Sequence, residues 1–208
     1  MLGTKRDQSL VYIVDDDVDT RESLQTLFEA AGFSVRTHGN AADFLGSFTH
    51  EGPSCLVVDL RLPGMSGAEL IQALAELKAR IPVLLLTGYA DVPTAVQVMK
   101  SGALDVIEKG GSPRPLIEAV QRAIDKDRVA WQAADSRAGF RGKVESLTVR
   151  ERQILELVVA GKTSKTVAAE LGISVNTVEV HRANIMKKMA ADSLVDLVRT
   201  YLSFAGEK

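Results

Sequence analysis

The sequence lacks several features that would point to particular classes of protein. It has one cysteine in 208 residues, so no internal disulfide can form, and this favours a reducing compartment. Cys55 stands in an apolar run with no histidine in the same motif, which favours a buried hydrophobic residue over a catalytic thiol. No apolar run approaches the ~20 residues that cross a bilayer, and the N-terminus lacks a signal core. We therefore expect a cytoplasmic protein with no membrane partner.

The chain also lacks a large excess of charge of either sign. The 25 Lys and Arg residues stand against 27 Asp and Glu, a net charge of -2, which argues against a nucleic-acid binder that is basic throughout. The halves differ, because residues 143–208 hold ten basic and eight acidic residues (+2) and the rest hold 15 and 19 (-4). An excess of +2 is weak evidence for DNA binding, so the motifs must decide.

Residues 1–127 alternate strand and helix patterns. Alternation of this kind predicts an α/β domain whose parallel sheet has helices on both faces. Short apolar runs predict strands near 10–14, 34–37, 54–58, 82–86 and 105–108. Helical spacing predicts helices near 18–31, 41–48, 67–79 and 92–101, and a fifth that begins at about 113.

Residues 128–145 separate this domain from the rest. Charges dominate there, so we expect the fifth helix to continue as a helical linker and to fray at its glycines. Trp131 in this segment marks either an interdomain or partner contact or a ring that packs on its own helix. Residues 146–208 show no strand pattern and predict a small all-α domain of four helices, with a capping box at Thr148 and Glu151. The second and third of these helices, near 165–171 and 175–189, form a helix-turn-helix, and the fourth covers 193–204.

Three apolar runs of the first domain end in charged residues: Asp15 with Asp16, Asp59, and Lys109. Ligands of open parallel sheets bind at the carboxyl ends of the strands, so these residues would share one crevice. Three carboxylates need a cation there, and Lys109 alone cannot neutralise them. Mg²⁺ fits, because it takes oxygen ligands and pairs with phosphate. The pattern predicts a metal-assisted phosphoryl site with Asp59 as nucleophile, and Thr87 at the end of the fourth strand adds a hydroxyl.

The segments VYIVDDD, CLVVDLRLPGMSG, VLLLTGYAD and GALDVIEK closely resemble the receiver domain of two-component response regulators, over residues 9 to about 125. The resemblance implies a flavodoxin-like sheet of order 2-1-3-4-5 and a phosphohistidine donor on a sensor histidine kinase. It also implies that the chain is not an enzyme, except that the domain catalyses its own phosphoryl transfer and autodephosphorylation. The implied roles are phosphoacceptor for Asp59, metal ligands for Asp15, Asp16, Asp59 and the Arg61 backbone carbonyl, switch hydroxyl for Thr87, and phosphate partner for Lys109.

Two positions depart from the receiver pattern. Gly110 and Gly111 stand where receivers usually have a proline after the lysine, and Val106 replaces the usual aromatic residue. Glycine leaves that loop freer, and the usual inward turn of the aromatic ring cannot occur. Because of these departures, a regulator that works without phosphorylation is a second interpretation of the sequence. A third interpretation, an aspartyl-phosphate hydrolase of the haloacid dehalogenase kind, needs an aspartate where Arg61 stands.

The segment LTVRERQILELVVAGKTSKTVAAELGISVNTVEVHRANIMKKM resembles the LuxR-type helix-turn-helix of the FixJ/NarL subfamily of response regulators, over about 146–204. The helix 175–189 would enter the major groove of promoter DNA, where base edges are legible. Glu179 and Arg182 would read bases, Lys165, Lys187, Lys188 and Thr177 suit phosphates, and His181 is equally a packing residue. The implied partners are a sensor kinase, double-stranded promoter DNA, a second copy of the phosphorylated chain, and RNA polymerase as a further candidate. The candidate DNA contacts are Lys165, Asn176, Thr177, Glu179, Val180, His181, Arg182, Asn184, Lys187 and Lys188.

Overall fold

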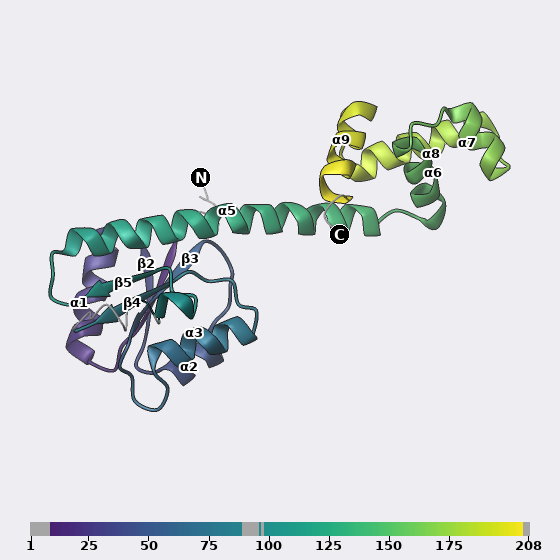
Figure 1. The fold of residues 1–208 in the computed structure, drawn as a ribbon. Coiled ribbons are helices and arrows are strands. Elements are labelled where there is room, and N and C mark those ends of the chain that lie inside the picture. The colour runs from purple at the N-terminus through teal and green to yellow at the C-terminus, as the bar shows by residue number, and fades with distance from the viewer. Residues whose placement is uncertain (1–8, 89–95, 97, 206–208) are drawn as a thin grey trace. The chain divides into compact units, whose positions relative to one another are not determined.

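The computed structural model describes residues 9–88, 96 and 98–205, and it divides the chain into two compact units, 1–132 and 133–208 (Figure 1). The first unit contains a five-stranded sheet of order β2-β1-β3-β4-β5, and all neighbouring strands are parallel. The predicted strand order is therefore confirmed, and each strand lies within one residue of its predicted limits. The strands are β1 (Leu10–Val14), β2 (Ser34–His38), β3 (Ser54–Asp59), β4 (Val83–Thr87) and β5 (Asp105–Glu108).

The sheet has a hydrophobic layer on each face, because successive side chains of a strand point to opposite sides. Val11 and Ile13 of β1 pack in a cluster with residues of α1 and α5, whereas Tyr12 and Val14 pack with residues of α2 and α3. Figure 1 shows α1 and α5 on one face and α2 and α3 on the other. Cys55 is fully buried, as predicted. The helices are α1 (Val18–Ala30), α2 (Ala41–Ser47), α3 (Gly67–Glu76) and α5 (Pro113–Glu145).

Polar residues cap the N-termini of α1, α2 and α3. Asp17 caps α1 by accepting a hydrogen bond from the Thr20 amide at 2.7 Å, and Ser66 and Glu69 form a capping box at the start of α3. Such caps satisfy amide groups that the helix leaves without a partner. Half of the predicted helix 92–101 lies outside the described residues, and within the described half residues 96 and 98–100 are helical.

Helix α5 does not fray at its glycines. It continues through Gly139 and Gly142 to Glu145, so the predicted fraying is wrong. A glycine inside a helix costs only about 1 kcal/mol relative to alanine. Packing of Phe140 against Tyr201 and Phe204 in the second unit offsets that cost, with ring centroids 6.0 and 4.7 Å apart.

The second unit is an all-α domain of four short helices that follow the end of α5. Their apolar positions enclose a core that includes Ile154, Val167, Val178 and Ile185. The predicted capping box at Thr148 is present, and Gly172 ends α7 with a φ of +65°, a left-handed conformation that favours glycine. No helix in the described part of the chain is long and apolar enough to cross a membrane. The helices are α6 (Val149–Val159), α7 (Ser164–Leu171), α8 (Val175–Met189) and α9 (Leu194–Ala205).

Candidate functional site

Two buried carboxylates and one exposed carboxylate meet at the carboxyl edge of the sheet. Asp15, directly after β1, is 1% exposed, and Asp59, the last residue of β3, is 8% exposed, whereas Asp16 lies at the surface. Carboxylate oxygens of the three residues all lie within 4.8 Å of one another. They converge because β1 and β3 are parallel neighbours, with Val14 opposite Val58. The structure thus brings together the acids that the sequence placed at separate strand ends.

Lys109 bridges the two buried carboxylates. Its Nζ lies 2.7 Å from Oδ2 of Asp15 and 3.2 Å from Oδ2 of Asp59. The pairing of β5 with β4 places it there, since the Lys109 amide donates to the Thr87 carbonyl at 2.7 Å. Burial acts to lower the pKa of Lys109, but the hydrogen bonds and charges of Asp15 and Asp59 together raise that pKa above its ordinary value. The lysine is therefore charged at neutral pH.

Asp15 is held from three sides. The Asp17 amide donates to its Oδ1 at 3.0 Å, and Lys109 donates to its Oδ2. Arg21 of α1 donates from Nη1 to the backbone carbonyl of Asp15 at 2.6 Å. Arg21 thus fixes the peptide that links Asp15 to Asp16. No sequence motif pointed to this arginine, because a charged residue in the first turn of a helix is usually solvated.

Gly67 lets helix α3 start directly against the end of β3. A Cβ at this position would lie 2.4 Å from the backbone oxygen of Asp59, closer than real contacts allow. The Gly67 amide also donates to the Leu60 carbonyl at 3.1 Å, which keeps the two backbones together. Only glycine permits this approach, so Gly67 helps to place Asp59. Spacing in the sequence assigned Gly67 only to a helix start, since spacing does not show backbone distances.

The other predicted members of the site lie around this group. Thr87 ends β4 and is 4% exposed. Arg61 lies two residues beyond β3, and the role of its backbone carbonyl stays a prediction. Gly110 has a φ of +81°, which proline cannot adopt. The loop after Lys109 therefore has a conformation that the usual proline of receivers would not allow. Val106 is partly buried and packs against the cluster under α2 and α3.

The chemistry of the donor set fits a divalent cation. Three carboxylates and one lysine leave a balance of two negative charges, and oxygen ligands of this kind suit Mg²⁺. A cavity of about 340 Å³ adjoins Lys109 between α1 and the loop into α5. Asp15, Asp16 and Asp59 do not line this cavity, so it lies beside the acid group and not over it.

In the second unit, most candidate DNA contacts of α8 are exposed. Val178, Ile185 and Met189 are buried in the core of the unit, while His181 and Arg182 are partly buried. The hydroxyl of Thr177 lies 2.8 Å from that of Ser174, the residue that caps α8. The exposed candidates, which stay predictions as DNA contacts, are Asn176, Thr177, Glu179, Val180, Asn184, Lys187 and Lys188 on α8 and Lys165 on α7.

Lys188 is engaged inside the domain. Its Nζ lies 2.7 Å from Oε2 of Glu151 and 3.2 Å from the carbonyl of Ser146. The carboxylate of Glu151 is buried and also accepts from the Thr148 amide at 2.8 Å. The hydrogen bond from Lys188 and, after it, that from Thr148 lower the pKa of Glu151. Lys188 therefore joins α8 to the start of α6, in addition to any phosphate contact.

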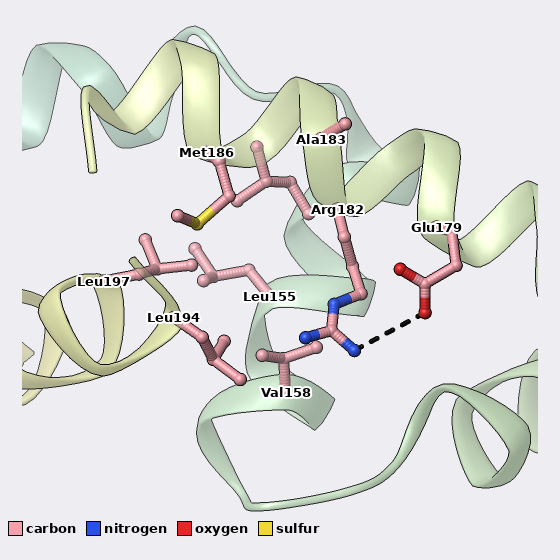
Figure 2. A pocket seen from close by; sticks show the side chains of 9 residues that line it. Leu155, Val158, Glu179, Arg182, Ala183, Met186, Leu194 and Leu197 are labelled. Atoms are coloured by element: carbon pink, nitrogen blue, oxygen red, sulfur yellow. Dashed lines mark ion pairs between the residues drawn. The ribbon is translucent and has the colours of Figure 1, made fainter. Parts of the chain in front are cut away.

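Arg182 points into a hollow between α6, α8 and α9 (Figure 2). The hollow has a volume of about 290 Å³, and Leu155, Val158 and Leu194 form part of its apolar lining. Nη1 of Arg182 lies 2.5 Å from the Ser164 hydroxyl and 3.7 Å from Oε1 of Glu179. In this conformation the arginine links α8 to α7, and a base contact would require it to turn outward.

Comparison with known proteins assigns a family to each unit. Residues 11–121 match the response regulator receiver domain, and residues 145–201 match the bacterial regulatory proteins of the luxR family. The chain is 45% identical over 193 residues to the transcriptional regulatory protein FixJ of Rhizobium meliloti (strain 1021), covering 93% of this chain and 95% of that protein. It is 40% identical over 192 residues to nodulation protein W of Bradyrhizobium diazoefficiens, covering 92% of this chain and 85% of that protein.

Solved structures give the same assignment. A structure of the response regulator StyR has a TM-score of 0.87 and 38% identity, covering 94% of this chain and 99% of that one. A crystal structure of full-length FixJ from B. japonicum has a TM-score of 0.56 and 36% identity, covering 98% of this chain and 100% of that one. The chain belongs to the phosphorylation-controlled transcriptional response regulators, in the FixJ group that joins a receiver domain to a LuxR-type helix-turn-helix domain.

Proposed function

We propose that Asp59 accepts a phosphoryl group from the phosphohistidine of a sensor kinase, and that this modification controls the binding of α8 to promoter DNA. The observation that supports it best is the meeting of Asp15, Asp16 and Asp59, with Nζ of Lys109 between the two buried acids. A nucleophilic carboxylate needs cationic groups beside it when its substrate is an anion.

The proposed reaction is a transfer between two nucleophiles. A carboxylate oxygen of Asp59 attacks phosphorus while the phosphorus–nitrogen bond of the donor breaks, and the leaving histidine nitrogen keeps the electron pair and takes up a proton. When bound by the three acids and the Arg61 carbonyl, Mg²⁺ supplies positive charge to the phosphoryl oxygens. Lys109 moves its contact from the Asp59 carboxylate to a phosphoryl oxygen, and the Thr87 hydroxyl donates to another.

Treatment with acetyl phosphate and Mg²⁺ tests this chemistry. Intact mass should rise by one phosphoryl group in the wild-type chain, and peptide mapping should place the group on Asp59. The Asp59→Asn variant and a wild-type sample with the metal chelated should both stay unlabelled. Labelling of Asp59→Asn to the wild-type level would contradict the assignment, as would a wild-type chain that no small donor labels.

Control of DNA binding calls for a separate measurement. One helix-turn-helix module makes few contacts, so we propose that phosphorylated chains dimerise and bind two adjacent half-sites. A duplex selected from a random library by the phosphorylated wild-type chain should bind that form more tightly than Asp59→Asn, and sedimentation should show a dimer only after phosphorylation. Equal affinity of the two forms would favour the phosphorylation-independent regulator to which Val106 and Gly110 point. A cytoplasmic location and a contact with RNA polymerase complete the proposal.

A further inference from the structure

A second polar cluster lies at the end of the sheet opposite Asp59. Asp127 of α5 is 3% exposed, and its Oδ2 accepts from the backbone amide of Ser54, the first residue of β3, at 2.8 Å. The same oxygen lies 2.9 Å from Nε2 of His50 in the loop before β3. The ring of His50 meets the indole of Trp131 edge-on, with centroids 4.9 Å apart. The ring of Trp131 thus packs on a residue outside its own helix, and the partner contact suggested for Trp131 stays a prediction.

The cluster lies where α5 makes its last buried contact with the sheet. The buried stripe of α5 runs through Leu116, Val120 and Ile124 at helical spacing, and Asp127 is its final member. An apolar residue would continue such a stripe at a lower cost in free energy, because a carboxylate removed from solvent needs hydrogen-bond or ion-pair partners. Trp131 follows one turn later, and the first unit ends at residue 132.

A buried hydrogen bond fixes the position of a helix along a sheet more strictly than an apolar contact does. Apolar stripes tolerate small slides of one element on another, whereas the Asp127 carboxylate keeps its partners in only one position of α5. His50 contacts both Asp127 and Trp131, so it holds two successive turns of the helix at once. The pair is therefore suited to fixing how α5 leaves the receiver.

We propose that His50, Asp127 and Trp131 form a clamp that fastens α5 to the receiver, and that a phosphorylation signal needs this clamp to reach the DNA-binding domain. The second part rests on the proposed function above. Helix α5 is continuous from Pro113, close to Lys109, to Glu145. Without the clamp its last receiver-bound turns are free to lean or slide, so both states of the receiver would give the same range of helix positions.

The anchoring can be measured without any DNA, because Trp131 is the only tryptophan of the chain. His50→Ala should shift the tryptophan emission and speed amide exchange in residues 127–132 by about tenfold or more. His50→Phe keeps an aromatic ring near Trp131 but removes the hydrogen bond, so it should speed exchange with a smaller spectral change. Lys126→Ala, an exposed neighbour on the same helix, is the matched control and should change neither. Wild-type emission and exchange in both His50 variants would overturn the clamp.

The coupling is measured as the ratio of DNA affinities with and without acetyl phosphate treatment, on a duplex selected by the phosphorylated wild-type chain. His50→Ala should reduce this ratio about fivefold, while labelling of Asp59 stays at the wild-type level. An unchanged ratio in a variant whose exchange is faster would overturn the coupling role. A wild-type chain that is labelled but shows no gain in affinity would refute both the proposed control of DNA binding and the coupling, and the exchange data would still decide the anchoring.

Discussion

Replacement of Lys188 by methionine tests whether this residue holds the DNA-binding domain together or serves DNA alone. Its amino group bonds to Glu151 at 2.7 Å and to the Ser146 carbonyl at 3.2 Å, so Lys188→Met removes both contacts. The methionine chain keeps most of the apolar volume, which limits the change to charge and hydrogen bonding. Lys187→Met, at the exposed neighbouring position, is the matched control.

The size of the effect follows from the exposure of the two partners. At 2.7 Å the Coulomb attraction is about 6 kcal/mol for an effective dielectric constant of ~20, before desolvation is subtracted. The side chain of Glu151 is 5% exposed and that of Lys188 is 35% exposed. Breaking a fully buried pair costs ~3–5 kcal/mol and breaking an exposed pair below ~1, so we expect a loss of about 2 kcal/mol. In a domain of this size that loss lowers Tm by roughly 8–16 °C.

The pH dependence adds a second check. Because the pKa of Glu151 is lowered in the folded chain, its stabilising effect is complete above its ordinary pKa and is lost as pH falls through the lowered value. Calorimetry should therefore show a large gap in Tm between wild type and Lys188→Met at neutral pH, which narrows in acid. The control Lys187→Met should keep its Tm and instead weaken DNA binding, with a salt dependence smaller by about one unit of slope.

Two results would refute this reasoning. A loss of stability below about 0.5 kcal/mol in Lys188→Met would mean that the pair is worth no more than a surface pair. Equal losses of DNA affinity in the two lysine variants, with equal Tm values, would mean that both residues act only on phosphates. A double-mutant cycle with Glu151→Gln assigns the energy to the pair, and we expect a coupling of about 1–2 kcal/mol.

Three further predictions concern the receiver. Gly67→Ala should destabilise the receiver by about 3 kcal/mol in urea unfolding, because the added Cβ meets the Asp59 carbonyl. Gly52→Ala is the control and should cause no such loss, because the space around Gly52 is open. Equal unfolding curves of the two variants would refute the steric argument. Arg21→Ala should weaken Mg²⁺ binding about threefold or more by calorimetry, with partial recovery in Arg21→Lys, and an unchanged affinity would remove its positioning role. Burial raises the pKa of the Cys55 thiol, so iodoacetamide should modify Cys55 in urea but not in buffer, and rapid modification of the folded chain would contradict its burial.

Strands and helix starts of this chain could be predicted from the sequence because their signals are local. Buried parallel strands appear as apolar runs such as Val83–Thr87, and capping boxes such as that at Thr148 show the helix starts within a residue. The acid triad was also accessible, since the carboxyl ends of parallel strands share one edge of the sheet. The end of α5 could not be predicted from the sequence. The packing of Phe140 on α9, which offsets the free-energy cost of the glycines in α5, connects distant parts of the chain.

Contacts that depend on the folded backbone account for what the sequence did not reveal. Gly67 is required by a backbone distance to Asp59, and no spacing rule contains that distance. Trp131 stood out only as an aromatic ring among charges, and its partner His50 lies in a loop with no motif. In both cases the residue type is informative only once the fold has brought its partner near.

The charges of α8 connect this structural detail to regulation. Lys188 is bonded to Glu151, and Arg182 is bonded to Ser164, so two cations that sequence alone would assign to DNA also hold the domain together. A single module with few cations left for phosphates binds duplex DNA weakly, and its affinity for DNA falls further as the salt concentration rises. Linking two such modules turns the second binding event into an intramolecular one, which raises affinity far more than any single contact. In the proposed mechanism, weak binding by each module is therefore what would let phosphorylation act through dimerisation, because a monomer with high affinity would already occupy the DNA before phosphorylation.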